Sequence, residues 1–161
     1  MKELCKVILL TYIGEKVVIN MNNEKKEYPK IREALNFCWK WIESKQVDEE
    51  KIYELLDDED EDDLVGYMLY ANNERDKKEY VVILGILSYV SHHILTNNKS
   101  PIPQFLSGTD DKYYDWVIAD VIKLNITDCT KETMIKVTKY CQDKISKNDL
   151  IFTKHEIMNI K

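Results

Sequence analysis

Two adjacent histidines, His92 and His93, and the serines Ser88 and Ser91 are the residues best placed by type and spacing to do chemistry. A serine one helical turn from a histidine can act as a nucleophile with the imidazole as its base, and paired histidines can bind a metal ion. Neighbours on a helix point about 100° apart, however, which does not suit one ion, and no spacing links His155 to the pair. No orienting acid, Gly-x-Ser-x-Gly turn or His-Glu-x-x-His motif accompanies them. The sequence therefore favours neither a hydrolase nor a metalloenzyme, and we expect no enzyme and no cofactor.

The cysteines also offer no reactive pair. Cys5, Cys38, Cys129 and Cys141 lie far apart, and none has the Cys-x-x-Cys spacing of a redox or zinc site. We expect reduced, mostly buried thiols, as are usual in cytoplasmic proteins.

The apolar segments do not predict export or a membrane span. The stretch from Val7 to Ile13 is preceded by the charges of Glu3 and Lys6 and is not followed by a small-residue cleavage site. The most apolar segment, Tyr80 to Val90, has about half the roughly 20 residues that cross a bilayer. We therefore expect a cytoplasmic protein with no membrane partner.

The strongest chemical feature is an unbroken run of seven acids, Asp57 to Asp63. The whole chain of 161 residues has 23 basic and 29 acidic side chains, a formal charge of −6, and is nearly neutral without this run. Between Asp48 and Asp63 eleven acids and one lysine give −10. Nucleic acid is disfavoured as a partner, because phosphates are bound by clustered lysine and arginine and the only strong cluster here is acidic.

Three interpretations of the acidic run follow from its composition. The alternation of Asp58, Asp60 and Asp62 resembles the start of a calcium loop, but Leu64 and Val65 follow where a glycine turn and more oxygen ligands are needed. The run can also be a solvated loop tip, the commonest meaning of such a block. Alternatively, the run and its tyrosines form a docking surface for a basic partner, in which carboxylates speed encounter and tyrosines supply buried contacts. That surface comprises Tyr53, Glu54, Asp57, Asp58, Glu59, Asp60, Glu61, Asp62, Asp63, Tyr67 and Tyr70, of which we expect at least one tyrosine to belong to the core.

The elements that position these residues are predicted to be helices. Only four glycines and three prolines occur, and Asn-Gly and Asp-Gly hairpin turns are absent. We predict an all-α fold, a single domain over residues 1–161 with six or seven helices around a central apolar helix from Lys77 to Leu95. The expected order is Glu3 to Met21, Pro29 to Ser44, a helix capped by Asp48 that ends at the acidic run, Leu64 to Ala71, Lys77 to Leu95, Thr109 to Lys123, a helix capped by Thr130, and a tail that docks on the body.

Several local features sharpen this prediction. The first helix is rich in β-branched residues, and Gly14 and Glu15 allow a hairpin as the alternative. Gly85 weakens the central helix by roughly 1 kcal/mol relative to alanine, which suggests that another backbone packs closely there. Trp39 and Trp41 diverge by about 200° on a helix, so we expect one in the core and one at the rim. Two prolines forbid a helix between Asn97 and Gly108.

Two segments carry a family resemblance. Residues 32–43, Arg-Glu-Ala-Leu-Asn-Phe-Cys-Trp-Lys-Trp-Ile-Glu, and residues 52–57, Ile-Tyr-Glu-Leu-Leu-Asp, resemble family six of the predicted immunity proteins of bacterial polymorphic toxin systems. The resemblance runs from Pro29 to about Asn97, continues through Ile86, Leu87 and Tyr89, and fades in the last third. The residues that carry the resemblance are packing residues and not a chemical motif. The resemblance implies a stoichiometric inhibitor that binds a cognate toxin in the cytoplasm and blocks its active site.

The acidic run fits a toxin partner that is itself basic, such as a nuclease that must hold phosphates. We expect this partner to be the basic C-terminal domain of a toxin protein. Two alternatives remain open: a helical adaptor or regulator unrelated to toxins, and a small hydrolase or metalloenzyme around Ser88, His92 and His93. The sequence does not specify an oligomeric state.

Overall fold

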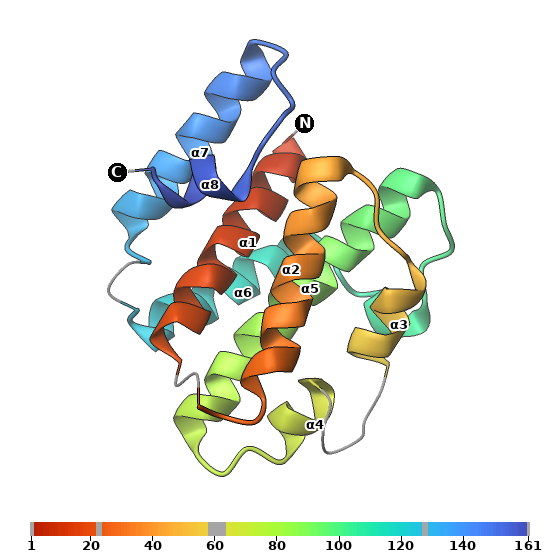
Figure 1. Ribbon diagram of the computed structural model, residues 1–161, viewed down its shortest axis with the longest axis vertical. Coiled ribbons are helices and arrows are strands. Elements are labelled where there is room, and N and C mark those ends of the chain that lie inside the picture. The colour runs from red at the N-terminus through yellow and green to blue at the C-terminus, as the bar shows by residue number, and fades with distance from the viewer. Residues whose placement is uncertain (1, 22–23, 58–63, 127–128, 161) are drawn as a thin grey trace.

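The computed structural model describes residues 2–21, 24–57, 64–126 and 129–160, and over these ranges it consists of eight α-helices and one 3₁₀ turn without a strand (Figure 1). The predicted all-α class is confirmed. The elements are α1 (Lys2–Asn20), α2 (Tyr28–Ser44), α3 (Glu50–Leu56), α4 (Leu64–Leu69), α5 (Glu74–Asn98), η1 (Gln104–Leu106), α6 (Asp111–Leu124), α7 (Lys131–Ser146) and α8 (Lys154–Met158).

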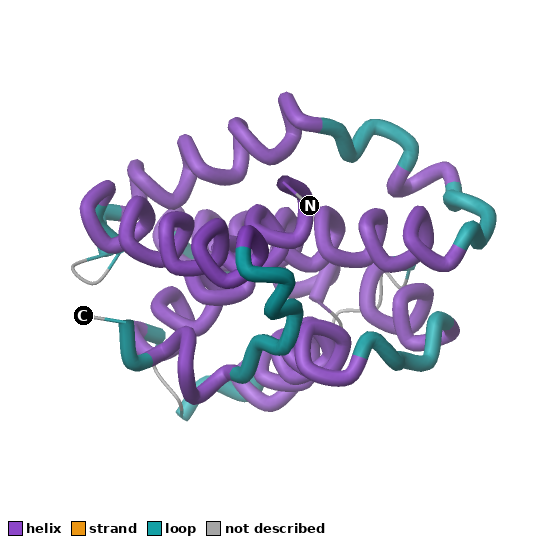
Figure 2. Tube along the Cα trace, turned by 90° about the horizontal axis from the view of Figure 1, so that it is seen from above, coloured by secondary structure: helices purple, strands orange, loops and turns teal. Residues whose placement is uncertain are grey.

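Helix α5 is the centre of the bundle, as its apolar sequence predicts. It packs against α1, α2, α3, α4 and α6, whereas α7 packs on α1 (Figure 1). Figure 2 shows the same set of helices from above, with loops joining them. The described residues share one hydrophobic core to which every α-helix contributes a buried side chain.

α5 is also the one described helix that is long and apolar enough to cross a membrane by length and composition. Within its most apolar window 72% of the residues are buried in the protein, which is the behaviour of a core helix. Its apolar surface is therefore covered by the neighbouring helices.

The N-terminal segment is the helix α1, and the hairpin alternative is wrong. Gly14 makes no turn and lies inside this helix. A Cβ atom placed on Gly14 would be 2.6 Å from Cδ2 of Leu35. The missing side chain thus allows α2 to approach α1 closely, and the β-branched residues of α1 are buried against its neighbours.

Gly85 has a close neighbour, but the neighbour is a side chain and not the backbone that the sequence suggested. A Cβ atom there would lie 2.8 Å from Cγ2 of Val117 on α6. Valine has one strongly preferred rotamer in a helix, so Val117 cannot move aside cheaply. Gly85 therefore sets the distance between α5 and α6.

We expect the substitution Gly85→Val to lower the free energy of unfolding by roughly 2 kcal/mol, because overpacking outweighs the small gain in helix propensity. Urea denaturation followed by circular dichroism measures this change. Gly108→Ala is the control, because nothing lies within 4 Å of a Cβ atom at Gly108 and its φ is not positive. Equal stability of the Gly85→Val variant and the unchanged protein would contradict the close packing of α5 and α6.

Several helix ends differ from the prediction, and α4 ends at Leu69 instead of Ala71. α5 begins earlier because the side chain of Asn73 caps it, accepting a hydrogen bond from the Asp76 backbone N–H, and it continues through Asn98. The loop predicted to begin at Asn97 therefore begins two residues later. It contains the 3₁₀ turn η1 directly after its second proline. α6 is capped by Asp110, not by Thr109, because Asp110 is the residue directly before the first turn and its carboxylate accepts a hydrogen bond from the Tyr113 N–H.

The Thr130 hydroxyl accepts a hydrogen bond from the Thr133 backbone N–H at the start of α7, as predicted. The N-cap residue of α3 is Glu49, without a side-chain cap hydrogen bond, and not the predicted Asp48. Asp48 lies one residue earlier, where its carboxylate accepts a hydrogen bond from the Glu50 N–H. The four cysteines are free and buried, as predicted.

Both tryptophans of α2 are buried, so the prediction that one lies at the rim is wrong. The ring of Trp41 meets the ring of His93 from α5 edge to face, with centroids 5.2 Å apart. Trp39 faces the other way and donates its Nε1–H to Glu15 on α1 over 2.9 Å. Helix α2 has neighbours on both sides, which a single-helix pattern does not reveal.

The C-terminal tail docks through Glu15, which is almost fully buried. Arg32 Nη1 donates to both Glu15 carboxylate oxygens (2.7 and 2.6 Å), and Lys154 Nζ donates to Oε1 over 2.6 Å. Burial alone would raise the pKa of Glu15, but these two cations outweigh it and hold the pKa below its usual value. Phe152 and Ile157 are fully buried beside this junction of α1, α2 and α8, as a docked tail requires.

Candidate partner-binding surfaces

Three of the predicted docking residues, Tyr53, Glu54 and Asp57, lie on α3 or directly after it, and the position of α3 depends on the end of α5. Glu49, just before α3, accepts hydrogen bonds from Asn98 Nδ2 (2.7 Å) and Ser100 Oγ (3.1 Å). Ile52 and Leu55 bury the inner face of α3, so Tyr53 and Glu54 point outward. α3 ends before Asp57, which is exposed, and the residues Asp58 to Asp63 of the acidic run lie outside the described part of the chain.

The aromatic component of this site comes from two distant segments. The Tyr53 side chain is 43% exposed, and its ring meets Phe105 of η1 edge to face with centroids 5.8 Å apart. Phe105 is 38% exposed. We call Tyr53, Glu54, Asp57 and Phe105 the α3 surface. The sequence did not predict Phe105 as a docking residue, because it lies 51 positions after Glu54 and only the fold brings η1 beside α3.

The carboxylates of this region differ in how far they are neutralised. Lys51 Nζ lies 2.6 Å from Glu54 and 2.7 Å from Glu33, so the charge of Glu54 is partly compensated. Asp57, Asp48 and Glu50 are exposed and have no ion pair with any residue in the described ranges. Unpaired carboxylates keep their field in solution and can attract a positive partner.

The other two predicted tyrosines differ in exposure. Tyr67 is only 8% exposed, and its ring lies 6.2 Å from that of Tyr80, so it belongs to the core. This matches the expectation that at least one tyrosine is a packing residue. Tyr70 is 60% exposed at the end of α4, next to the exposed Leu69. Tyr53 and Tyr70 are therefore accessible to a partner, whereas Tyr67 does not belong to the predicted docking surface.

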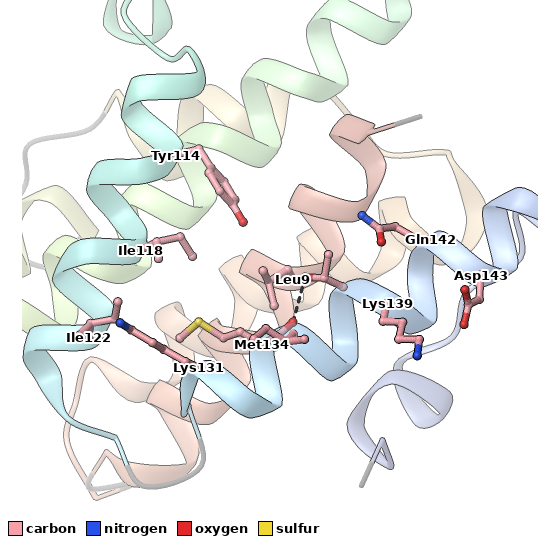
Figure 3. A pocket seen from close by; sticks show the side chains of 11 residues that line it. Leu9, Tyr114, Ile118, Ile122, Lys131, Met134, Lys139, Gln142 and Asp143 are labelled. Carbon is pink, nitrogen blue, oxygen red and sulfur yellow. Dashed lines mark hydrogen bonds between the residues drawn. The ribbon is translucent and has the colours of Figure 1, made fainter.

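A second surface is a groove that the sequence analysis did not predict. α6 packs mainly on α5 and α7 on α1, and between α6 and α7 they leave an open space of about 740 Å³ with Leu9 of α1 at its floor (Figure 3). Tyr114, Ile118 and Ile122 line the α6 side, and Met134 and Ile135 are among the α7 residues. We call this space the α6–α7 groove. The apolar stripe of α6 did signal a contact face, but the sequence alone does not show that half of it remains uncovered.

The histidines line a small cavity of about 130 Å³ together with Glu3, Tyr89 and Thr109. The hydroxyl of Tyr89 donates to Glu3 over 2.6 Å. Burial lowers the pKa of His93, which keeps this imidazole neutral near pH 7.

The serines are not coupled to these histidines. Ser91 is fully buried, and its Oγ has no hydrogen-bond partner among the described residues. Ser88 is hydrogen-bonded to Tyr113. In the described ranges no three histidine, cysteine or acidic side chains are placed to hold a metal ion. Among the residues that the structure describes, there is therefore no activated serine and no set of side chains that binds a metal ion.

Together the fold and these surfaces define a helical protein whose distinctive side chains lie on open surfaces suited to binding another protein. Residues 5–124, about three quarters of the chain, match the family model of immunity protein Imm6, so the chain belongs to this family of immunity proteins. The family confirms the resemblance found in α2 and α3, extends it to α1 and α6, and gives the chain a role in toxin immunity. No curated protein and no solved structure matches the chain.

The family assignment also bears on the remaining alternatives. An immunity protein acts by binding a cognate toxin, which favours an inhibitor without catalytic activity over a hydrolase. The match ends at residue 124, so α7 and α8 lie outside it. The α6–α7 groove therefore has a floor and one wall inside the family match and its other wall outside.

Proposed function

We propose that this protein neutralises one cognate toxin in the cytoplasm by forming a stoichiometric complex that blocks the toxin's active site. The contact is made by the α3 surface together with the acidic run Asp57 to Asp63. The toxin domain it covers is basic, as is usual for an enzyme that holds the phosphates of a nucleic acid. A nuclease domain at the C-terminus of a larger toxin protein fits this description.

The observation that carries the proposal is the concentration of charge at α3. A charge of −10 falls between Asp48 and Asp63, while the rest of the chain is slightly positive. Three carboxylates near α3 are exposed without an ion pair among the described residues, and the Tyr53–Phe105 pair supplies apolar contact area beside them. Charge of one sign beside exposed aromatic rings combines fast encounter with lasting contact.

Growth rescue tests the function itself. The toxin is expressed alone and together with this protein in a sensitive bacterium, and its nuclease activity is measured with purified components at increasing molar ratios. We expect full protection of growth and complete inhibition near one protein per toxin. Continued killing while both proteins are folded and soluble would rule out the proposed immunity. Inhibition without a fixed ratio would rule out stoichiometric blocking.

Charge removal tests the surface. We expect replacement of each acid from Asp57 to Asp63 by Asn or Gln to slow association with the toxin by roughly tenfold or more at low salt, because electrostatic steering is lost. The dependence of the association rate on salt should weaken as well. Stopped-flow fluorescence or surface plasmon resonance measures both quantities.

A matched control exchanges every Asp of the run for Glu and every Glu for Asp, which preserves length and charge. This variant should associate as fast as the unchanged protein. Unaltered association kinetics in the neutralised variant would remove the acidic run from the interface, and equal slowing in the exchanged variant would show that charge is not the cause.

A further inference from the structure

We infer that the α6–α7 groove is a second protein-binding site, and that it receives a short amphipathic helix of the toxin protein that carries carboxylates beside its apolar face. The inference depends on the proposed function only for the existence of a toxin partner. It does not depend on the α3 surface, because α3 and α7 lie on different sides of the molecule in Figure 1.

The lining of the groove is apolar where a partner would touch it. Leu9 forms the floor, Ile118 and Ile122 come from α6, and Met134 and Ile135 from α7 (Figure 3). Ile135 is 65% exposed and Ile122 is 45% exposed. Such exposed positions on a helix are usually occupied by polar side chains. Exposed isoleucines that line one groove from two helices indicate an interaction surface, whereas a single exposed isoleucine does not.

The dimensions suit a helix of two to three turns. On α6 the lining residues Tyr114, Ile118 and Ile122 follow at intervals of four and span about 12 Å, since a helix rises 1.5 Å per residue. On α7 the lining extends from Lys131 to Asp143, about 18 Å. An occupying helix of about 8 to 12 residues would place apolar side chains at i, i+3 or i+4, and i+7 against the groove.

The charges at the edge determine the chemistry of the occupant. Lys131 and Lys139 line the groove from α7, and both are exposed with no ion pair to a carboxylate in the described ranges. Lys136 on the same helix, by contrast, pairs with Glu132 over 2.8 Å and does not line the groove. Asp143, one helical turn after Lys139, also lines the groove, so the two lysines leave an excess of one positive charge, which favours a helix with carboxylates flanking its apolar face.

The limits of the family match suggest what this site contributes. Leu9 and all of α6 lie within residues 5–124, whereas the α7 wall with both lysines lies outside the match. The family match therefore describes the floor and the α6 wall and leaves the α7 wall outside it, so the α7 wall is the part of the groove that is free to differ between related proteins. We therefore assign the α7 wall to discrimination between cognate and non-cognate toxins.

The test uses the full-length protein and the complete toxin protein, with dissociation constants measured by isothermal titration calorimetry. We expect Ile135→Glu to weaken binding by at least tenfold, and the double charge reversal Lys131→Glu and Lys139→Glu to weaken it by at least fivefold. Ile151→Glu is the control for the first variant, because Ile151 is 72% exposed but does not line the groove. Lys112→Glu with Lys147→Glu is the control for the second, since both lysines are exposed on or next to the same helices and outside the groove lining.

Hydrogen exchange on the complex provides a second readout. Amides of α7 and of the facing part of α6 should gain protection when the toxin binds, and thermal melts should show that all four variants remain folded. Unchanged affinity of Ile135→Glu would overturn the inference. A complex that forms and still responds to neutralisation of the acidic run would in that case leave the proposed function intact.

Self-association is the competing explanation of the groove. Sedimentation velocity over a range of protein concentrations distinguishes it. A dimer of the unchanged protein that Ile135→Glu abolishes, with toxin affinity unaffected, would assign the groove to a second copy of this chain and overturn our inference. A monomer at all concentrations supports it.

Discussion

The substitution Glu15→Gln is expected to lower the free energy of unfolding by roughly 3 kcal/mol at pH 7, because it removes the carboxylate of a buried ion-pair cluster. For a domain of this size the melting temperature should fall by roughly 6 to 12 °C. The effect is large because the cations of two elements, Arg32 of α2 and Lys154 of α8, lose their common carboxylate at once. The Trp39 ring and two cations all contact this carboxylate.

Glutamine has nearly the shape of glutamate, so packing is preserved and the change tests charge. Its amide oxygen can still accept one hydrogen bond, for example from Trp39, but the two cations then lie beside a neutral group. Arg32 is mostly buried, with its side chain 24% exposed, and it cannot recover its full hydration. Lys154 is more exposed and would lose less, and α8 should loosen before the rest of the bundle.

The pH dependence has a defined sign. The pKa of Glu15 in the folded protein lies below its ordinary value of 4.5, which is the value expected in the unfolded chain. The stabilisation is therefore present above about pH 4.5 and is lost as the pH falls through the folded-state pKa. The difference in stability between the unchanged protein and Glu15→Gln should be largest near neutral pH and should shrink in acid.

Urea denaturation at pH 7 and at pH 3 measures both effects. The control is Glu132→Gln, which removes an exposed carboxylate paired with Lys136 over 2.8 Å. An exposed i, i+4 pair of this kind contributes only about 0.5 kcal/mol. Equal losses in the two variants, or a difference that does not depend on pH, would show that Glu15 does not hold the tail through its charge.

The class of fold could be predicted because local signals dominate helix formation. The apolar stripe of α2, the apolar sequence of α5 and the Thr130 cap of α7 are patterns within single segments. Gly85 was informative for a related reason, since a glycine inside a central helix requires a close neighbour. The neighbour itself, Val117, could not be named because the pairing of α5 with α6 is a long-range property.

The failures have the same origin. Trp39 and Trp41 are both buried because α2 is covered from two sides, by α1 and α8 as well as by α5. A prediction from one helix assumes one covered face. The Asp110 cap of α6 was missed because two adjacent residues can both cap a helix, and only the geometry decides between them.

The candidate site was predictable in part. The acidic charge and Tyr53 follow from composition, but the contribution of Phe105 depends on the loop that returns η1 to α3. The α6–α7 groove could not be predicted, because an apolar stripe on α6 normally indicates a fully buried face. Its half-exposed Ile122 is visible only once α7 is seen to pack on α1.

The end of the family match at residue 124 does not coincide with an end of the hydrophobic core. Six fully or nearly buried apolar side chains follow that position in α7, in the tail and in α8, and they cover α1 and its neighbours. These are Met134, Val137, Cys141, Ile145, Phe152 and Ile157. A segment can vary in sequence among relatives and still be needed for folding, provided that it keeps apolar residues at the positions facing the core.

A chain that ends at Asn125 is therefore expected not to fold cooperatively. Burial of a large apolar side chain contributes about 1.5 to 3 kcal/mol, so losing six removes on the order of 10 kcal/mol. This is comparable to the whole stability of an ordinary domain, which is about 5 to 15 kcal/mol. Loss of Lys154 also leaves Glu15 with Arg32 as its one remaining cation among the residues described above.

Thermal melts followed by far- and near-ultraviolet circular dichroism measure this expectation, since all three tryptophans remain in the shortened chain. A chain that ends at Asn159 is the control, because it keeps α7, α8 and all six buried side chains. A sharp transition of the shorter chain within a few degrees of the full protein would mean that residues 5–124 are a self-sufficient domain. In that case the fold would not need α7. If the shortened chain instead unfolds without a cooperative transition, α7 is part of the core as well as the wall of the α6–α7 groove.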